Sequence, residues 1–263
     1  LFTATGRRSD AERNIMSLPS CRWWLLTTCL MASPSYAELF YAPPAPDENA
    51  PNFSGSAELG YTKLTGNANT QTLLAKARLT WLTGRNTHTF RAETRSVQDN
   101  DDTTSERYLV GARERYELEN NNYLFGFARW ERDRFSGYDS QLTTIAGYGR
   151  QLLTGPTHTL SAEVGPGYRH DAYAAGGSDD LTLAYSALDY TYHFSDDISF
   201  DQELSAEATH ISVTTRSLST ITSQLNSHLA LRVSYDVRSN THPPPDAEAR
   251  PDPTTSVSIL YGW

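Results

Sequence analysis

Cysteine and long hydrophobic runs are both scarce in this chain of 263 residues. Its two cysteines, Cys21 and Cys29, lie near the N-terminus, so the rest of the chain has no thiol and no disulfide. Beyond the N-terminal segment, no stretch reaches the about 18 consecutive apolar residues that a membrane-spanning helix needs. The apolar share, 38%, is low for a conventional core in a chain of this length. These shortages exclude a helical membrane protein.

Positive charge is also in short supply. The formal net charge is −9 at pH 7, which offers nothing for a nucleic-acid backbone to bind. The sequence carries no phosphate-binding loop, no cluster of His and Cys with metal-ligand spacing, and no cofactor motif. We therefore expect no nucleic-acid partner, no cofactor and no metal site.

A short apolar run follows Arg22 and ends in Ser35-Tyr36-Ala37. A basic flank, a short apolar segment and a small-x-Ala ending are typical of a cleavable signal peptide, so residues 1–37 are predicted to be removed on export. Within them, Met16 is a candidate translation start, which would place residues 1–15 upstream of the true protein.

The N-terminal segment has one alternative interpretation. A lipoprotein signal would make Cys29 the lipidated residue, but the preceding Leu26-Thr27-Thr28 matches that pattern poorly. Residues 38–53 are rich in Pro and Ala, which predicts a disordered periplasmic linker.

Residues 54–263 alternate between apolar and polar side chains in segments bounded by short turns. Successive side chains of a strand point to opposite faces, so each segment is predicted to be a β-strand with one apolar face. Leu73 and Leu79, for example, share a face opposite Lys76 and Arg78. About twelve such strands follow one another, an even number, which predicts a single antiparallel transmembrane β-barrel. The alternative is a soluble periplasmic β-sandwich, in which the apolar faces pack on each other.

Connection lengths and aromatic residues favour the membrane barrel. The longer connections are expected near residues 66, 98, 135, 171, 211 and 240, and the shorter ones near 84, 119, 154, 195 and 226. Membrane barrels have long outer loops and short periplasmic turns. On that topology, two aromatic belts meet the two lipid interfaces, with Trp81, Phe90, Tyr116, Tyr192, Phe200 and Trp263 at the periplasmic ends and Tyr61, Tyr108, Trp130, Tyr168 and Tyr235 at the outer ends.

The final strand, residues 254–263, places Val257, Ile259, Tyr261 and Trp263 on one face. This aromatic ending resembles the closing-strand signal of bacterial outer-membrane proteins. The resemblance implies recognition by the barrel assembly machinery.

Charged residues occupy the opposite faces of the strands and would share a closed interior. The favoured prediction is a network of salt bridges that plugs a narrow barrel, and the alternative is a small ion- or solute-conducting pore. The candidate network comprises Arg78, Arg91, Glu93, Arg95, Arg113, Arg115, Glu131, Asp133, Glu163, Arg169, Asp201, Glu203, Glu207, Arg232 and Asp236. The same faces also carry Glu58, Lys76, Arg107, Glu117, Arg129 and Arg238.

Two strands have ambiguous faces. In residues 123–134, Phe125 and Phe127 fall on the charged face, which predicts either a bulge or an aromatic filler of the lumen. Residues 181–194 change phase near Ala187, which again predicts a bulge.

His210 and Ser212 form the one enzyme-like pair. Outer-membrane phospholipases use a Ser with a His two residues away on the outer wall, but the Asn-Gly that follows their Ser is replaced here by Val213-Thr214. We expect no enzyme, with a hydrolase as the alternative.

Acidic residues gather in the predicted outer loops. A solvated rim is favoured there over a Ca²⁺ or Mg²⁺ site that bridges lipopolysaccharide. The residues concerned are Asp99, Asp101, Asp102, Asp179, Asp180, Asp246, Glu248 and Asp252.

Several motifs, in order, resemble one known family. Among them are Glu58-Leu-Gly-Tyr, Thr65-Gly-Asn-Ala-Asn-Thr-Gln, Glu131-Arg-Asp-Arg-Phe-Ser-Gly-Tyr and Glu163-Val-Gly-Pro-Gly-Tyr-Arg. They are similar to the family catalogued as domain of unknown function 481, described as salt-induced outer-membrane proteins. The resemblance covers roughly residues 54–263. It implies a β-barrel among the lipid and lipopolysaccharide of a Gram-negative outer membrane, with no established activity, and we expect a structural or narrow-pore role linked to salt or osmotic stress.

Overall fold

The computed structural model describes residues 52–64, 70–100, 102–242 and 252–263. The predicted signal peptide lies outside the described residues, as does the predicted linker up to residue 51, and Phe53 already belongs to the first strand. Among the described residues, no helix is long and apolar enough to cross a membrane.

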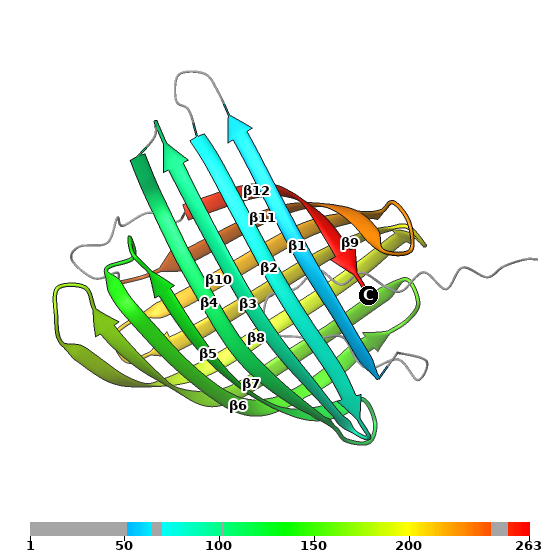
Figure 1. The fold of residues 1–263 in the computed structure, drawn as a ribbon. Coiled ribbons are helices and arrows are strands. Elements are labelled where there is room, and N and C mark those ends of the chain that lie inside the picture. The colour runs from blue at the N-terminus through cyan, green and yellow to red at the C-terminus, as the bar shows by residue number, and fades with distance from the viewer. Residues whose placement is uncertain (1–51, 65–69, 101, 243–251) are drawn as a thin grey trace, which may run out of the picture. The chain divides into compact units, whose positions relative to one another are not determined.

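Twelve strands make up the described part of the chain (Figure 1). They are β1 (Phe53–Leu64), β2 (Thr70–Thr83), β3 (Asn86–Asp99), β4 (Asp102–Glu117), β5 (Asn122–Asp133), β6 (Tyr138–Thr154), β7 (His158–Tyr173), β8 (Ser178–Ser195), β9 (Ile198–Thr209), β10 (Val213–Gln224), β11 (Leu229–Asn240) and β12 (Asp252–Gly262).

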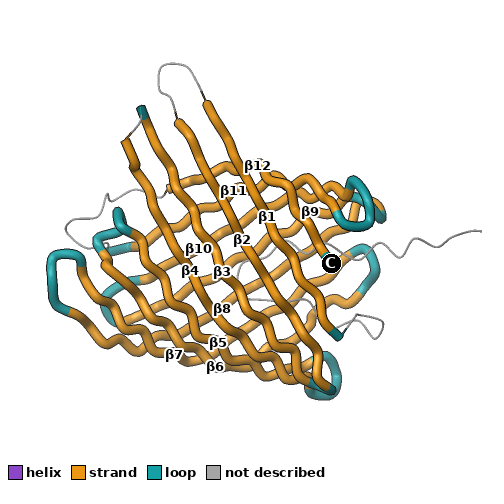
Figure 2. The backbone as a smooth tube through the Cα atoms, viewed as in Figure 1, coloured by secondary structure: helices purple, strands orange, loops and turns teal. Residues whose placement is uncertain are grey.

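Each strand pairs antiparallel with its sequence neighbours, and β1 pairs with β12 to close the barrel (Figure 2). Closure gives β1 and β12 a neighbour on each side, and their mutual pairing joins residues 56–60 to residues 258–262. Short connections suit this arrangement: the β2–β3 turn contains Gly84 with φ 61°, a backbone conformation that glycine adopts without strain. The predicted twelve-stranded antiparallel barrel is confirmed, and the β-sandwich alternative is wrong because all strands belong to one closed sheet.

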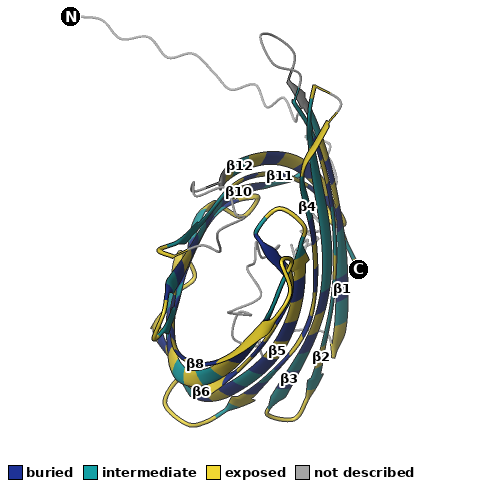
Figure 3. Cartoon of the chain, turned by 90° about the vertical axis from the view of Figure 1, so that its left-hand side faces the viewer, coloured by how far each residue is buried: buried dark blue, intermediate teal, exposed yellow. Residues whose placement is uncertain are grey.

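Burial alternates along the strands, as the ribbon in Figure 3 shows. Apolar side chains face outward from the barrel wall: Leu59 is 68% exposed and Ile259 is 54% exposed. Charged side chains take the inward positions, and Glu131 is only 2% exposed. Leu59 and Ile259 therefore do not lie in a dry centre, where a soluble sandwich would need its apolar strand faces to pack.

The two strands with ambiguous faces differ in outcome. In β5, Phe125 and Phe127 are buried inside the barrel, so the aromatic-filler prediction is confirmed. In β8, inward and outward residues alternate without interruption past Ala187, so the predicted bulge there is wrong. The register shift of β8 lies further on, between His193 and Ser195. The error arose because β8 turns apolar residues inward, opposite to the usual polarity of a barrel interior.

Connection lengths follow the predicted alternation only in part. The gaps at residues 65–69 and 241–251 are the longer ones, but the connections at 134–137 and 174–177 are as short as the turn at 118–121. The loop predicted near residues 98–104 is wrong, because β3 continues to Asp99 and β4 begins at Asp102. Antiparallel pairing between the two strands continues out to this turn.

Candidate functional site in the barrel interior

The inward face of the barrel brings four arginine side chains together around Glu131. Its carboxylate accepts from Arg107 at 2.5 Å and lies 2.7 Å from Nε of Arg129. Arg216 donates to both carboxylate oxygens, at 3.1 and 2.8 Å, and Nη1 of Arg238 lies 3.8 Å from Oε1. These arginines come from β4, β5, β10 and β11. We call this group the arginine layer.

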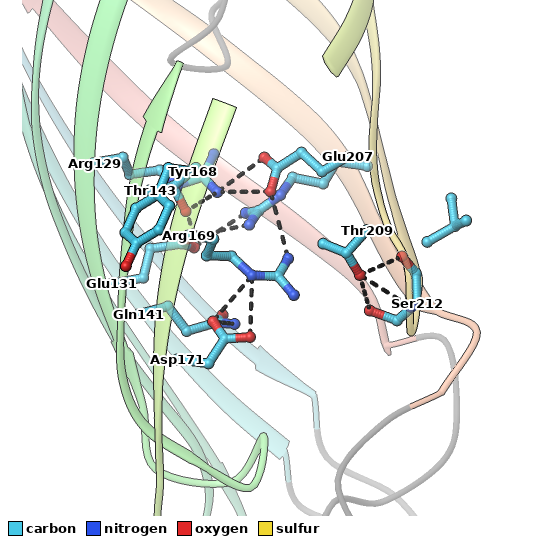
Figure 4. A network of polar contacts seen from close by, with 12 residues as sticks. Arg129, Glu131, Gln141, Thr143, Tyr168, Arg169, Asp171, Glu207, Thr209 and Ser212 are labelled. Carbon is cyan, nitrogen blue, oxygen red and sulfur yellow. Dashed lines mark hydrogen bonds and ion pairs between the residues drawn. The ribbon is translucent and has the colours of Figure 1, made fainter. Parts of the chain in front are cut away.

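The arginine layer connects to further ion pairs across the lumen (Figure 4). Arg129 donates to Glu207 of β9 at 2.9 Å, and Nη1 of Arg169 lies 3.7 Å from the same carboxylate. Arg169 also pairs with Asp171 at 3.0 Å, and Gln141 donates to Asp171 at 2.8 Å. Since β5 and β9 are not neighbours in the sheet, these contacts span the interior rather than run along the wall.

A second set of charges surrounds Glu58 of β1. Arg232 donates to Glu58 at 2.8 Å, Ser258 donates at 2.7 Å, and Nζ of Lys76 lies 3.6 Å away. Nearby along the wall, Arg91 donates to Glu93 at 2.7 Å. Glu58 lies on β1 and its partners lie on β2, β11 and β12, so its contacts with Arg232 and Ser258 bridge the seam where the barrel closes.

Apolar side chains fill another part of the interior. Buried Tyr123, Phe125, Phe127, Ile145, Leu183, Tyr185 and Ala187 form one cluster, which we call the aromatic layer. Its rings interlock, with centroids 5.8 Å apart for Phe125 and Tyr185 and 5.6 Å apart for Phe127 and Tyr185. Edge contacts of this kind add to the stabilisation that burial provides.

One ion pair is embedded in the aromatic layer. Glu163 pairs with Arg113 and accepts hydrogen bonds from Tyr123 at 2.9 Å and Tyr185 at 3.3 Å. The Arg113 guanidinium also lies 4.8 Å from the ring centroid of Phe125. The carboxylate is therefore surrounded by donors, which is what a charge buried among rings requires.

Glycine in β6 makes room for the aromatic layer. Gly149 lies directly opposite Tyr123 in the β5–β6 pairing. A Cβ at Gly149 would come within 2.2 Å of the Tyr123 ring, so the ring lies flat over the glycine backbone. Any larger residue at this position would displace the ring.

Two cavities inside the described barrel measure about 30 and about 20 Å³. Spaces of this size hold one or two water-sized groups each. They leave no room for a sugar or a nucleotide.

The structure places the other predicted network residues as follows. Arg95 pairs with Asp236 at 3.3 Å, Arg78 lines the smaller interior cavity together with Arg91 and Arg232, and Glu203 is buried. Asp201 accepts hydrogen bonds from its neighbours Thr191 at 2.8 Å and Ser199 at 3.2 Å.

Two more of the predicted residues lie apart from the arginine layer. Arg115 pairs with Glu117 and lies 3.6 Å from the ring centroid of Tyr123. Asp133 is at the end of β5, where it accepts from the backbone N–H of Phe135 at 3.2 Å, so it stabilises a turn.

Five residues of the network escaped sequence reasoning: Tyr123, Gln141, Asp171, Tyr185 and Arg216. Arg216 lies in a strand rich in Ser and Thr, where small polar residues on both faces hide the alternation. Asp171 was assigned to a loop, but β7 continues to Tyr173. The continued alternation from Glu163 through Arg169 was the signal that would have found it.

The closing strand is held at both of its edges. β12 pairs with β1 and β11, and Val257, Ile259 and Tyr261 face outward. The backbone N–H of Trp263 donates to the carbonyl of Gly55 at 3.0 Å. Recognition of this strand by the assembly machinery stays a prediction.

His210 and Ser212 are not brought together as a catalytic pair. Ser212 is 4% exposed, and its hydroxyl lies 3.4 Å from that of Thr209 in the tight turn between β9 and β10. His210 is exposed, and among the described residues no hydrogen bond joins it to Ser212. The pair therefore lacks the contact by which a histidine would activate a serine.

The acidic rim is described only in part. Asp101, Asp246 and Glu248 lie outside the described residues. Within the described ranges, no group of three or more His, Cys, Asp or Glu side chains is arranged to hold a metal ion.

A closed antiparallel barrel with an apolar outer wall and a charged interior defines a β-barrel of the outer-membrane type. The chain belongs to the family described as "Protein of unknown function, DUF481", whose model matches residues 57–263. It is 34% identical over 209 residues to "Uncharacterized protein YdiY" of Escherichia coli (strain K12), an alignment that covers 80% of this chain and 82% of that protein. The family predicted from the sequence motifs is confirmed.

Solved structures share the fold at low sequence identity. The NanC porin superposes with a TM-score of 0.51 and 9% identity, over 79% of this chain and 98% of that one. An outer membrane channel from Pseudomonas putida F1 superposes with a TM-score of 0.51 and 12% identity, over 84% of this chain and 98% of that one. These likenesses concern the fold alone.

Proposed function

We propose that this protein is an outer-membrane barrel whose lumen is a narrow pore held closed by cross-lumen ion pairs. The observation that carries the proposal is the arginine layer, in which one carboxylate, Glu131, joins arginines from four strands. An open pore would have its charges along the wall around a central space. Here the charges meet in the middle instead.

The outer wall supports a membrane location. Large apolar side chains such as Leu59, Leu73 and Ile259 are exposed on this wall. Their exposure is unfavourable in water and favourable in hydrocarbon. Exposed Trp81 and Trp130 belong to the two expected aromatic belts. Outer-membrane lipid and lipopolysaccharide are the partners that suit this wall.

Location is tested by fractionation and electrophoresis. We expect the full-length protein in the outer-membrane fraction, and we expect the unheated protein to migrate differently from the heated one, as folded membrane barrels do. A protein recovered in the soluble periplasmic fraction would contradict the proposed location.

The strength of the arginine layer supports a closed lumen. Removing one partner of a buried ion pair costs about 3–5 kcal/mol, because the remaining charge is left uncompensated. Opening the lumen would have to separate several such contacts at Glu131 and Glu207. The closed state is therefore expected to dominate at rest.

Closure is tested by single-channel recording in planar bilayers. We expect the wild-type protein to show no conductance steps or very small ones. Glu131→Gln keeps the size of the side chain but removes the charge that holds four arginines, so we expect anion-selective steps to appear. Glu106→Gln is the matched control, since Glu106 pairs with exposed Arg134 at the rim. Large steady steps in the wild type, or silence in Glu131→Gln, would contradict the proposal.

The link to salt stress rests on the family resemblance. We expect the amount of protein in the outer membrane to rise when the host grows in high salt. Immunoblots of membranes from low- and high-salt cultures test this expectation, and equal amounts would remove the link.

A further inference from the structure

We infer that the larger interior cavity is a binding site for one chloride-sized anion. The cavity measures about 30 Å³ and lies against the arginine layer, with Arg107, Arg129 and Arg216 in its lining. The inference concerns the same closed lumen as the proposed function, but it requires only the closed structure and no conduction.

Four buried donors on the cavity lining have no hydrogen-bond partner among the described residues. They are Nε of Arg95, Nε of Arg107, Nε of Arg216 and Oγ of Ser234. The three arginine side chains are 12%, 7% and 3% exposed. A buried donor without an acceptor is costly, so a site with four of them favours an occupant that accepts hydrogen bonds.

The charge around the cavity also favours an anion. Six cations line it, namely Lys76, Arg91, Arg95, Arg107, Arg129 and Arg216, against the two carboxylates Glu93 and Asp236. Both carboxylates are already engaged: Glu93 accepts from Arg91 at 2.7 Å, and Asp236 accepts from Arg95 at 3.3 Å.

Carboxylates behind the lining do not restore neutrality. Glu58, Glu131 and Glu207 pair with Lys76, Arg107, Arg216 and Arg129 from outside the cavity. The six lining cations then face five carboxylates, and those carboxylates are shared with Arg169, Arg232 and Arg238 as well. One monovalent anion would offset the local excess of positive charge.

The size of the cavity selects among anions. A space of about 30 Å³ holds one or two water-sized groups, so chloride or bromide fits. Sulfate, phosphate and organic carboxylates carry too many heavy atoms for this space. The predicted specificity is therefore for small halides.

Thermal unfolding of the full-length protein in detergent tests the site without any measurement of conduction. The melting midpoint is compared in sodium chloride, sodium bromide and sodium gluconate at equal ionic strength, which removes general screening. We expect both halides to raise the midpoint by about 3–5 °C at ten times their dissociation constant. Equal midpoints in chloride and gluconate would overturn the inference.

Variants connect the shift to the cavity. Arg107→Met is expected to abolish the halide-dependent shift, and Ser234→Ala to reduce it while the charge stays unchanged. The matched control is Ser205→Ala, because Ser205 is also buried inside the barrel with an unpartnered hydroxyl but does not line the cavity. A shift that survives in Ser234→Ala at full size and falls in Ser205→Ala would contradict the assignment.

Crystals grown in sodium bromide give a readout that does not depend on variants. We expect one anomalous peak next to Arg107, Arg216 and Ser234 of the wild-type protein. Bromide peaks found only at the outer surface would overturn the site. Neither experiment measures current. A bound halide in a protein that conducts freely would therefore support this inference and contradict the proposed function.

Discussion

The arginine layer and the aromatic layer fill the same barrel by opposite means. The arginine layer joins charges from β4, β5, β10 and β11 around one carboxylate, Glu131. The aromatic layer packs rings and aliphatic side chains from β5, β6 and β8, with the single embedded pair of Arg113 and Glu163. Ion pairs stabilise the arginine layer, whereas close packing of side chains stabilises the aromatic layer. The two layers should therefore respond differently to the same kind of substitution.

Removal of charge should affect the arginine layer most. Glu131→Ala leaves Arg107, Arg129 and Arg216 without their common partner, so we expect the free energy of unfolding to fall by about 3–5 kcal/mol. Urea unfolding of the refolded protein in lipid vesicles, followed by tryptophan fluorescence, measures the change. A loss below about 1 kcal/mol, the size typical of an exposed pair, would show that the layer is solvated.

A hydrogen bond to the embedded carboxylate should matter less. Tyr123→Phe keeps the ring of the aromatic layer but removes the donor to Glu163. Hydrogen bonds to charged groups contribute about 1.5–3 kcal/mol, so we expect a loss in that range by the same unfolding measurement. No change would mean that Arg113 and Tyr185 alone satisfy the carboxylate.

The close packing of the aromatic layer is tested at Gly149, which lies against the Tyr123 ring. Gly149→Ala places a methyl group against the Tyr123 ring, and overpacking of this kind costs about 1–3 kcal/mol. In combination with Tyr123→Leu, the alanine should cost less than it does alone, because the ring it collides with is gone. Strictly additive losses in the double variant would show that the ring does not lie over Gly149.

The smallest effect is expected outside both layers. Arg132 and Asp139 form an ion pair at the exposed rim, at 3.1 Å, with side chains that are 50% and 59% exposed. Arg132→Ala should cost less than about 1 kcal/mol, because solvent screens such pairs. A loss as large as that of Glu131→Ala would remove the distinction between rim and interior.

The same contrast explains how much the sequence predicted. Alternation between apolar and charged residues sufficed for the barrel, for the outward face of Leu73 and Ile259, and for an inward face at Arg129 and Glu131. It works wherever the two faces differ in polarity, because a strand has only two faces to assign.

Alternation fails where the interior is itself apolar. In β8, Leu181, Leu183 and Tyr185 point inward while Thr182 and Ala184 point outward, so the change in polarity near Ala187 was mistaken for a bulge. Polarity alone cannot distinguish a residue in contact with lipid from one in a dry lumen, since both environments accept the same side chains.

Partner choice inside the barrel was also beyond the sequence. Glu131 and Arg216 are 85 positions apart, and their contact depends on how far each strand is staggered around the barrel. Composition indicated that charges would balance across the lumen, but only the register shows which carboxylate joins which arginines.

The central claim, that the lumen is closed, is tested most directly by the reactivity of a cysteine placed inside it. The chain has only Cys21 and Cys29, both within the predicted signal peptide, so a new thiol is expected to be the only one in the exported protein. Ser234 lines the interior cavity, so Ser234→Cys places a thiol inside the lumen. Ser227 lies in an exposed turn, so Ser227→Cys provides the exposed thiol for comparison.

Both variants are treated, in lipid vesicles, with a charged, water-soluble methanethiosulfonate reagent. The closed lumen predicts that the thiol at position 227 reacts within seconds while the thiol at position 234 reacts slower by orders of magnitude. Similar rates at the two positions would contradict the account.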